Sequence, residues 1–158
     1  ESHHIEVIVP NMPNTAEPKL AEWLKKIKEA VKTSDEETYF VGHSVGAITV
    51  LRYIEKLSPE EKVGGVVLVG GLITASKKKL IDFVKDKIDF QKIKKHITGK
   101  IVVIHSDNDP VVPLSDAELV RDNLDAELII VPGAWHFDDA DGWTKLPPAR
   151  DALLKMMK

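Results

Sequence analysis

The sequence predicts an α/β protein with about five mostly parallel strands and helices on both faces of the sheet. Short apolar runs typical of buried strands alternate with amphipathic stretches typical of helices along the 158 residues. Glycine, proline and short polar residues separate these segments. Because no internal repeat and no long linker divides the chain, we expect one domain over residues 1–158.

The strand-like segments share apolar runs bounded by turn residues. They lie at residues 5–9, 38–42, 63–69, 100–105 and 127–131. The third run ends at Gly70-Gly71, and the fourth ends at the polar loop 106–109. Because helix-like segments separate these runs, a parallel sheet is favoured over an antiparallel one.

The helix-like segments are recognised by their apolar spacing and by start and stop residues. They lie over about 18–31, 45–57, 115–124 and 149–157. The first carries an apolar stripe made by Leu20, Leu24, Ile27 and Val31. Ser58-Pro59 stops the second, and Ser115 with Glu118 forms a capping box that opens the third.

The segment Gly42-His43-Ser44-Val45-Gly46 joins an expected strand to an expected helix. This G-x-S-x-G pattern is typical of a nucleophile elbow, a turn so tight that the residues flanking the serine must be small. Gly42 and Gly46 lack a Cβ, so strand and helix can approach while Ser44 is lifted above the sheet edge. We expect Ser44 to be a nucleophile and the Val45 N–H to face the oxyanion formed when Ser44 attacks a carbonyl. The alternative is an ordinary strand-to-helix turn.

A nucleophilic serine needs a general base, and an acid that orients this base. His136 follows the last expected strand, and Asp107 and Asp109 follow the strand before it. Carboxyl ends of parallel strands share one edge, so these residues are expected beside Ser44. Asp109 is favoured as the acid because Pro110 rigidifies the backbone after it. Asp107 fits a side chain that closes the loop on its own backbone, and either aspartate could be a turn residue without chemistry.

Other polar residues near these loops have a simpler interpretation. His43 directly precedes the serine but points away from the edge, so we expect a packed histidine. The carboxylates that follow His136 are expected to form a solvated loop, and at most they would favour the protonated imidazole. They belong to Asp138, Asp139 and Asp141.

Four stretches of the chain resemble the small α/β-hydrolases of the retinoblastoma-binding protein 9 and YdeN serine hydrolase family. They are Val9–Asn14, Val41–Gly46, Ser106–Pro110 and Trp135–Phe137, in the family's order and over most of the chain. The resemblance implies a three-layer α/β-hydrolase-like fold. It also implies a serine hydrolase in which Ser44 is the nucleophile, Asp109 the acid and His136 the base.

Members of this family open with a strand that ends in His-Gly, and its loop helps complete the oxyanion hole. This sequence contains no His-Gly pair, and its first expected strand, Ile5–Val9, matches the family's second. Three arrangements are compatible with this departure: a removed N-terminus, an engineered or shortened chain, or direct pairing of the strands at 5–9 and 38–42. Val45 would then be the single oxyanion donor unless a loop N–H near Asn11 substitutes.

Asn11, Leu72 and Trp135 are the candidate substrate contacts. The stretch 72–99, which mixes lysines with apolar residues, is longer than a simple crossover requires. It is expected to form one or two surface helices with a solvated lysine face. The alternative is a small cap over the site whose apolar residues line an acyl pocket.

The composition argues against several classes of partner and cofactor. The net charge of −3 disfavours nucleic acid as the main partner. No apolar run approaches the roughly 18 residues of a membrane span. The chain has 0 cysteines, which excludes disulfides, thiolate metal sites and cysteine catalysis and is compatible with the cytoplasm. Asp107-Asn108-Asp109 lacks the glycine and distal glutamate of a calcium loop, so we expect no metal and no cofactor.

These observations predict a serine hydrolase of small ester or amide substrates that works through an acyl-enzyme intermediate. The alternative is a catalytically weak or inactive binding or scaffold protein on the same fold, which includes a truncated or engineered chain. The acyl group, the leaving group and the oligomeric state are left open by the sequence.

Overall fold

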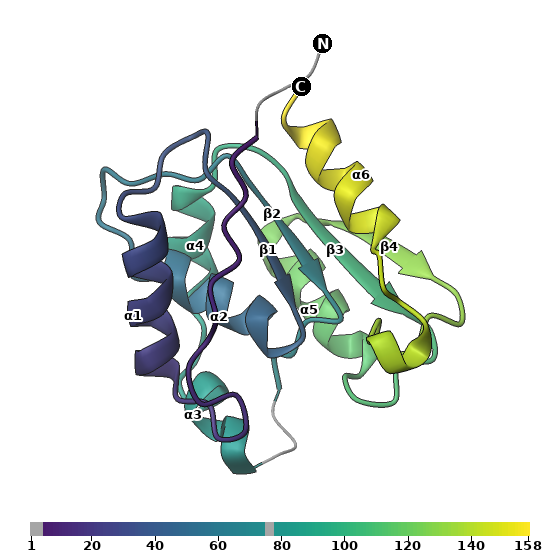
Figure 1. Cartoon of the computed structure of the whole chain (residues 1–158). Helices are drawn as coiled ribbons and strands as arrows, with labels where there is room; N and C mark the ends of the chain where they lie inside the picture. Colours follow the sequence, from purple (N-terminus) through teal and green to yellow (C-terminus); the bar gives the residue numbers. More distant parts are fainter. Residues whose placement is uncertain (1–4, 75–77) are drawn as a thin grey trace.

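The computed structural model describes residues 5–74 and 78–158, and its centre is a parallel sheet. The sheet has four strands in the order β1-β2-β3-β4. Their bounds are Tyr39–His43 for β1, Gly65–Val69 for β2, Ile101–Ser106 for β3 and Glu127–Val131 for β4. Because neighbouring strands are parallel, each connection crosses back over one face of the sheet and carries helices with it (Figure 1).

Helices cover both faces of the sheet. The α-helices are α1 (Leu20–Val31), α2 (Val45–Ile54), α3 (Ile81–Val84), α4 (Phe90–His96), α5 (Leu114–Leu124) and α6 (Pro147–Met156), and the 3-10 helices are η1 (Lys78–Leu80) and η2 (Asp139–Asp141). Residues of α1 to α5 share one apolar core with the sheet, and α6 packs on the opposite face. The predicted three-layer arrangement is therefore confirmed. Within the described ranges, none of these helices has the length and apolarity to cross a membrane.

The alternation of side chains along β2 separates two cores. Val66 and Leu68 point to the helices α1 to α5, whereas Val67 and Val69 point to α6. All residues of β2 and β3 are buried. Strands covered on both faces are mostly apolar, which is why both segments contain continuous apolar runs; only His105 and Ser106, at the end of β3, are polar.

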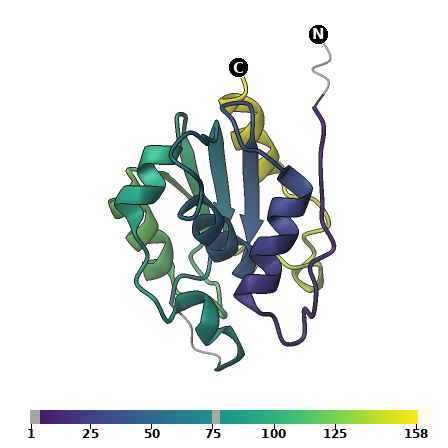
Figure 2. The same ribbon diagram turned by 90° about the vertical axis from the view of Figure 1, so that its left-hand side faces the viewer.

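The prediction of a strand at Ile5–Val9 is wrong. The segment has no strand structure, and the side chains of Val7 and Val9 are 74% and 84% exposed. Figure 2 shows it running along the outside of the molecule past α1, apart from the strands. Its β-branched residues favour an extended backbone, but a strand also needs a partner for its N–H and C=O groups. The expected direct pairing with β1 therefore does not occur, and the sheet has four described strands.

The capping box predicted at Ser115 and Glu118 is also wrong. Helix α5 begins one residue earlier, with Pro113 at the N-cap position and no side-chain cap. Asp116, which lies in its first turn, is turned into the protein. Its carboxylate accepts hydrogen bonds from the backbone N–H groups of Ile73 (2.7 Å) and Thr74 (2.8 Å). The residues after β2 are thereby fastened to α5.

The stretch 72–99, apart from residues 75–77, which lie outside the described residues, is attached to the core through α2. Phe83 and Ile93 are fully buried in the core that α2 shares. The guanidinium of Arg52 donates to the carbonyl oxygens of Phe83 (3.0 Å), Asp86 and Lys87 (3.4 Å). The Phe83 carbonyl lies in the last turn of α3, where such groups lack intrahelical partners, and those of Asp86 and Lys87 lie in the segment after the helix. Arg52 therefore supplies donors to this helix end and to the segment that follows it.

The turn between β1 and α2 needs a small residue at only one of the two glycines that flank Ser44. Ser44 has a φ of 54° and a ψ of −121°, a conformation that non-glycine residues rarely adopt. A Cβ on Gly42 would lie 2.7 Å from the Gly46 carbonyl oxygen and 2.8 Å from the Ala47 Cα. A Cβ on Gly46 would meet nothing within 4 Å. The requirement for a small residue is thus confirmed for Gly42 and wrong for Gly46.

We expect Arg52→Met to lower the free energy of unfolding by about 2–4 kcal/mol, because it leaves the buried Phe83 carbonyl and the partly buried carbonyls of Asp86 and Lys87 without this donor. Arg52→Lys, which keeps the charge but loses the planar fork, should fall between wild type and Arg52→Met. Urea denaturation followed by circular dichroism measures both values. A wild-type midpoint for Arg52→Met would show that water satisfies these carbonyls equally well.

We expect Gly42→Ala to disrupt the elbow, because backbone atoms of α2 cannot withdraw from the new methyl group as a flexible side chain would. Gly46→Ala is the matched control, since its methyl group would enter open space. Thermal unfolding of the two variants should show a clearly lower midpoint for Gly42→Ala alone. Equal midpoints would contradict the steric argument.

Candidate active site

Three loops that follow β1, β3 and β4 bring the candidate catalytic residues to one edge of the sheet. Ser44 follows β1, Asp109 lies in the loop after β3 and His136 lies in the loop after β4. Figure 1 shows that the arrowheads of all four strands point to this edge. Carboxyl ends of parallel strands are the usual place for ligands and reacting groups in open α/β sheets.

Hydrogen bonds connect the three side chains in a row. His136 Nδ1 lies 2.8 Å from Asp109 Oδ2, and His136 Nε2 lies 2.9 Å from Ser44 Oγ. An ionised carboxylate can only accept, so Nδ1 carries the imidazole proton. Nε2 is then left with its lone pair directed at the hydroxyl of Ser44. This is the arrangement in which an imidazole can take the proton of an attacking serine.

Asp109, rather than Asp107, contacts His136. The Oδ1 of Asp109 also accepts from the backbone N–H groups of Val111 (2.8 Å) and Val112 (2.9 Å). Burial alone would raise the pKa of this carboxyl, but the hydrogen bonds from His136 and from the two backbone groups outweigh it, and the pKa of Asp109 lies below its ordinary value. The hydrogen bonds therefore favour the ionised form of this carboxyl.

Asp107 does not close its loop on its own backbone, and that expectation is wrong. Its Oδ1 accepts from the backbone N–H of Gly133, at 2.8 Å, in the neighbouring loop after β4. The spacing of residues within one loop cannot indicate a partner that lies 26 positions away.

Val45 begins α2, directly after Ser44. The first N–H groups of a helix have no intrahelical acceptor, and the positive end of the helix dipole lies there too. The neighbouring N–H of Leu72 is already used, because it donates to the carbonyl oxygen of Ser44 at 3.2 Å. The Val45 N–H is therefore a suitable donor for an oxyanion formed at Ser44.

The three candidate substrate contacts lie in different surroundings. Trp135 directly precedes His136 and is 53% exposed. Leu72 is 4% exposed, so its side chain belongs to the core and only its backbone reaches Ser44. Asn11 is exposed in the segment before α1, and the part of the chain that the structure describes records no hydrogen bond for its side chain. A role in substrate binding stays a prediction for all three.

His43 and Asp141 contact the backbone of His136, which the sequence did not indicate. His43 Nε2 lies 2.7 Å from the His136 carbonyl oxygen, and the two ring centroids are 5.0 Å apart. The expectation that His43 points away is thus wrong. Asp141 Oδ2 accepts from the His136 N–H at 3.0 Å, rather than being a solvated carboxylate only. His43 ends β1 and Asp141 lies in η2, so both contacts depend on how the chain folds back around His136. A residue pattern along the chain does not encode them.

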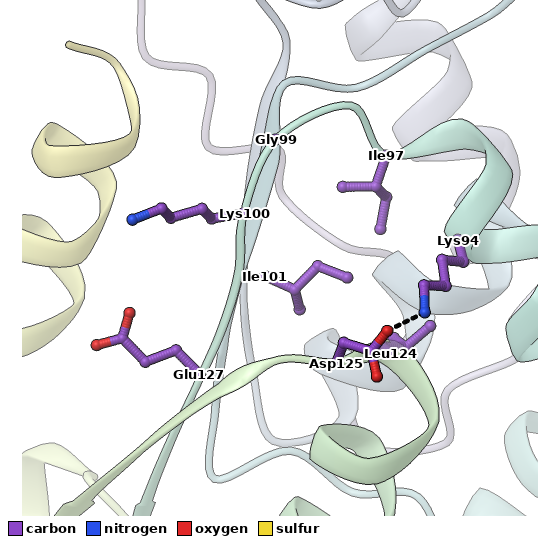
Figure 3. A pocket seen from close by; sticks show the side chains of 8 residues that line it. All are labelled: Lys94, Ile97, Gly99, Lys100, Ile101, Leu124, Asp125 and Glu127. Carbon is purple, nitrogen blue, oxygen red and sulfur yellow. Dashed lines mark hydrogen bonds and ion pairs between the residues drawn. The ribbon is translucent and has the colours of Figure 1, made fainter.

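One surface pocket lies at the other end of the sheet. Its volume is about 400 Å³, and Figure 3 shows Lys94 and Asp125, which form an ion pair, among the residues that line it. Ile101 and Glu127, which begin β3 and β4, also line it. It therefore faces the amino ends of the strands, away from Ser44 and His136. Among the described residues, no cluster of histidine and carboxylate side chains has the arrangement of a metal site.

Comparison of the sequence with known proteins identifies relatives. The serine hydrolase family matches residues 4–155 of the chain. YdeN of Bacillus subtilis (strain 168) is 32% identical over 151 residues, which cover 94% of this chain and 79% of YdeN. The serine hydrolase RBBP9 of Rattus norvegicus is 27% identical over 139 residues, which cover 86% of this chain and 72% of RBBP9.

Solved structures also resemble this chain. The crystal structure of the ydeN gene product from B. subtilis has a TM-score of 0.87 at 34% identity, over 92% of this chain and 79% of that chain. The meta-cleavage product hydrolase from Pseudomonas fluorescens IP01 shares the fold alone, with a TM-score of 0.59 at 16% identity over 92% of this chain and 73% of that chain. The fold is therefore α/β-hydrolase-like. Because the family match spans nearly the whole chain, this protein belongs to the serine hydrolase family.

Proposed function

We propose that this protein hydrolyses small ester or amide substrates through an acyl-enzyme intermediate on Ser44. The observation that carries the proposal is the row of hydrogen bonds from Ser44 Oγ through His136 to Asp109. A serine hydroxyl is a weak nucleophile at neutral pH, and this row supplies the base and the acid that activate it. Membership of the serine hydrolase family supports the same class of reaction.

In the proposed first step, Ser44 Oγ attacks the acyl carbon while His136 Nε2 takes the hydroxyl proton. The carbonyl oxygen becomes negatively charged and faces the Val45 N–H. The protonated His136 then gives its proton to the leaving alcohol or amine as the bond to the acyl carbon breaks. A water molecule then attacks the acyl-enzyme in the same way, with His136 taking its proton and returning it to Ser44 Oγ. This step releases the carboxylic acid and restores Ser44. Asp109 keeps the Nδ1 proton and stabilises the charged imidazole throughout.

The Val45 N–H, at the start of α2, is the oxyanion donor of this proposed mechanism. Losing one oxyanion donor typically costs about 10²–10³ in rate. The placement of Val45 directly after Ser44 is therefore part of the proposal.

A binding or scaffold protein on the same fold is the second candidate. The observation that favours it is the exposed apolar surface of Val7 and Val9, in a segment that pairs with none of the described strands. Exposed apolar residues that lie together are features of interaction surfaces. Only the hydrolase should react covalently with a serine-directed reagent.

We expect a fluorophosphonate to form an adduct on Ser44, located by peptide mass spectrometry. Its phosphorus resembles the tetrahedral intermediate, so the reaction needs both the nucleophile and its base. Ser44→Ala should abolish the adduct, and His136→Ala should slow it by about 10³ or more. A folded protein that forms no adduct would reject the hydrolase and leave the binding protein as the better proposal.

We expect Asp109→Asn to lower hydrolysis by about 10⁴, because the amide no longer fixes the Nδ1 proton. It should also change the acid stability. The pKa of Asp109 lies below its ordinary 3.8 in the folded protein, so the ionised carboxylate stabilises the fold above that pH. This contribution is lost as the pH falls through the lowered pKa.

The free energies of unfolding of wild type and Asp109→Asn should therefore differ more at about pH 6 than at about pH 3, measured by urea denaturation. Ser44→Ala is the control, since it removes the neighbouring hydroxyl and leaves the carboxylate. A difference that does not change with pH would contradict the lowered pKa of Asp109.

A further inference from the structure

Beyond the end of the sheet, side chains continue the hydrogen bonding between the loops after β3 and β4. The last backbone pair of the two strands is Ser106 with Val131. Four consecutive amides, those of residues 133–136, then each donate to a side-chain oxygen. The acceptors are Asp107 (2.8 Å), Ser106 (2.9 Å), Asn108 (2.9 Å) and Asp141 (3.0 Å), in that order. We call these four side chains the amide clamp.

Asn108 links two parts of the amide clamp. Its Oδ1 accepts from the backbone N–H of Trp135 and also from the hydroxyl of Ser106, at 2.7 Å. The same hydroxyl oxygen accepts from the N–H of Ala134, at 2.9 Å. The Ser106 hydroxyl thus donates to Asn108 and accepts from Ala134, while Asn108 Oδ1 accepts two hydrogen bonds, so the directions are consistent.

The backbone that the amide clamp holds is strained. Trp135 has a φ of 54° and Phe137 a φ of 59°, so a bulky residue in the left-handed region lies on each side of His136. Such conformations persist only where the surrounding structure fixes them. The bonds to Asn108 and Asp141 fix this stretch from two sides, and His43 holds the His136 carbonyl oxygen.

We propose that Asn108 and Asp141 are positioning residues that direct the imidazole of His136 at Ser44. The proposal rests on the function proposed above and deepens it. The loop after β3 contributes twice: Asp109 binds the imidazole, and the three residues before it hold the backbone that carries the imidazole. A misplacement of about 1 Å at a reacting group can slow a reaction by about 10²-fold.

The test uses four variants in the full chain. Asn108→Ala and Asp141→Ala each remove an acceptor, whereas Asn108→Asp and Asp141→Asn keep one. Both side chains are exposed, so the alanine variants are expected to fold. Asp35→Ala is the matched control, because Asp35 accepts from the Glu37 N–H and the Thr38 hydroxyl in an exposed turn far from the site.

Two measurements separate positioning from plain stability. The first is the NMR signal of the His136 Nδ1 proton, which depends on the bond to Asp109 and needs no activity. The second is the rate of fluorophosphonate reaction at Ser44.

We expect both alanine variants to lose or broaden the Nδ1 signal and to react about 10- to 100-fold more slowly. Asn108→Asp, Asp141→Asn and Asp35→Ala should stay within about threefold of the wild-type rate. Folded alanine variants with the wild-type signal and rate would overturn the proposal. Loss of the fold in both, shown by circular dichroism, would also overturn it, because the amide clamp would then serve stability.

Failure of the proposed function is distinguishable from failure of this inference. A wild-type protein that does not react at Ser44 would reject the hydrolase. The Nδ1 signal in the alanine variants would still report whether Asn108 and Asp141 hold the imidazole of His136 in place.

Discussion

A parallel sheet that is covered on both faces has room for polar side chains only where its strands end. Val67 and Val69 of β2 face α6, and their neighbours face the helices on the other side. Polar groups therefore collect at the carboxyl edge, where three loops meet. The serine, the carboxylate and the imidazole lie together because the interior of the sheet excludes them. The same constraint explains the amide clamp, since backbone N–H groups beyond the last strand pair must find side-chain acceptors.

The parts of the molecule that repeat a local pattern could be predicted from the sequence. The apolar runs that became β2, β3 and β4 mark buried strands, and the stripe on α1 marks an amphipathic helix. The turn at Ser44 has a recognisable glycine pattern. The loop positions of Asp109 and His136 then follow from the parallel order of the strands, since all carboxyl ends share one edge.

The parts that depend on contacts between distant segments could not be predicted. Ile5–Val9 has the composition of a strand, but composition does not supply a neighbouring strand. The need for Gly42 but not Gly46 depends on where the backbone of α2 passes. Asp107 and His43 each bond to a loop far along the chain, so spacing within their own segments gives no signal.

The row of hydrogen bonds at the site also has a consequence for folding. It joins residues that are 92 and 27 positions apart, and it runs from the loop after β1 to the loops after β3 and β4. Contacts of such high separation form late, because long loops must close before any of them is gained. A chain in which β4 has not yet docked has Ser44 without the imidazole of His136. Under the proposed mechanism, acylation then requires a complete sheet, and a folding intermediate that lacks the last strand does not react.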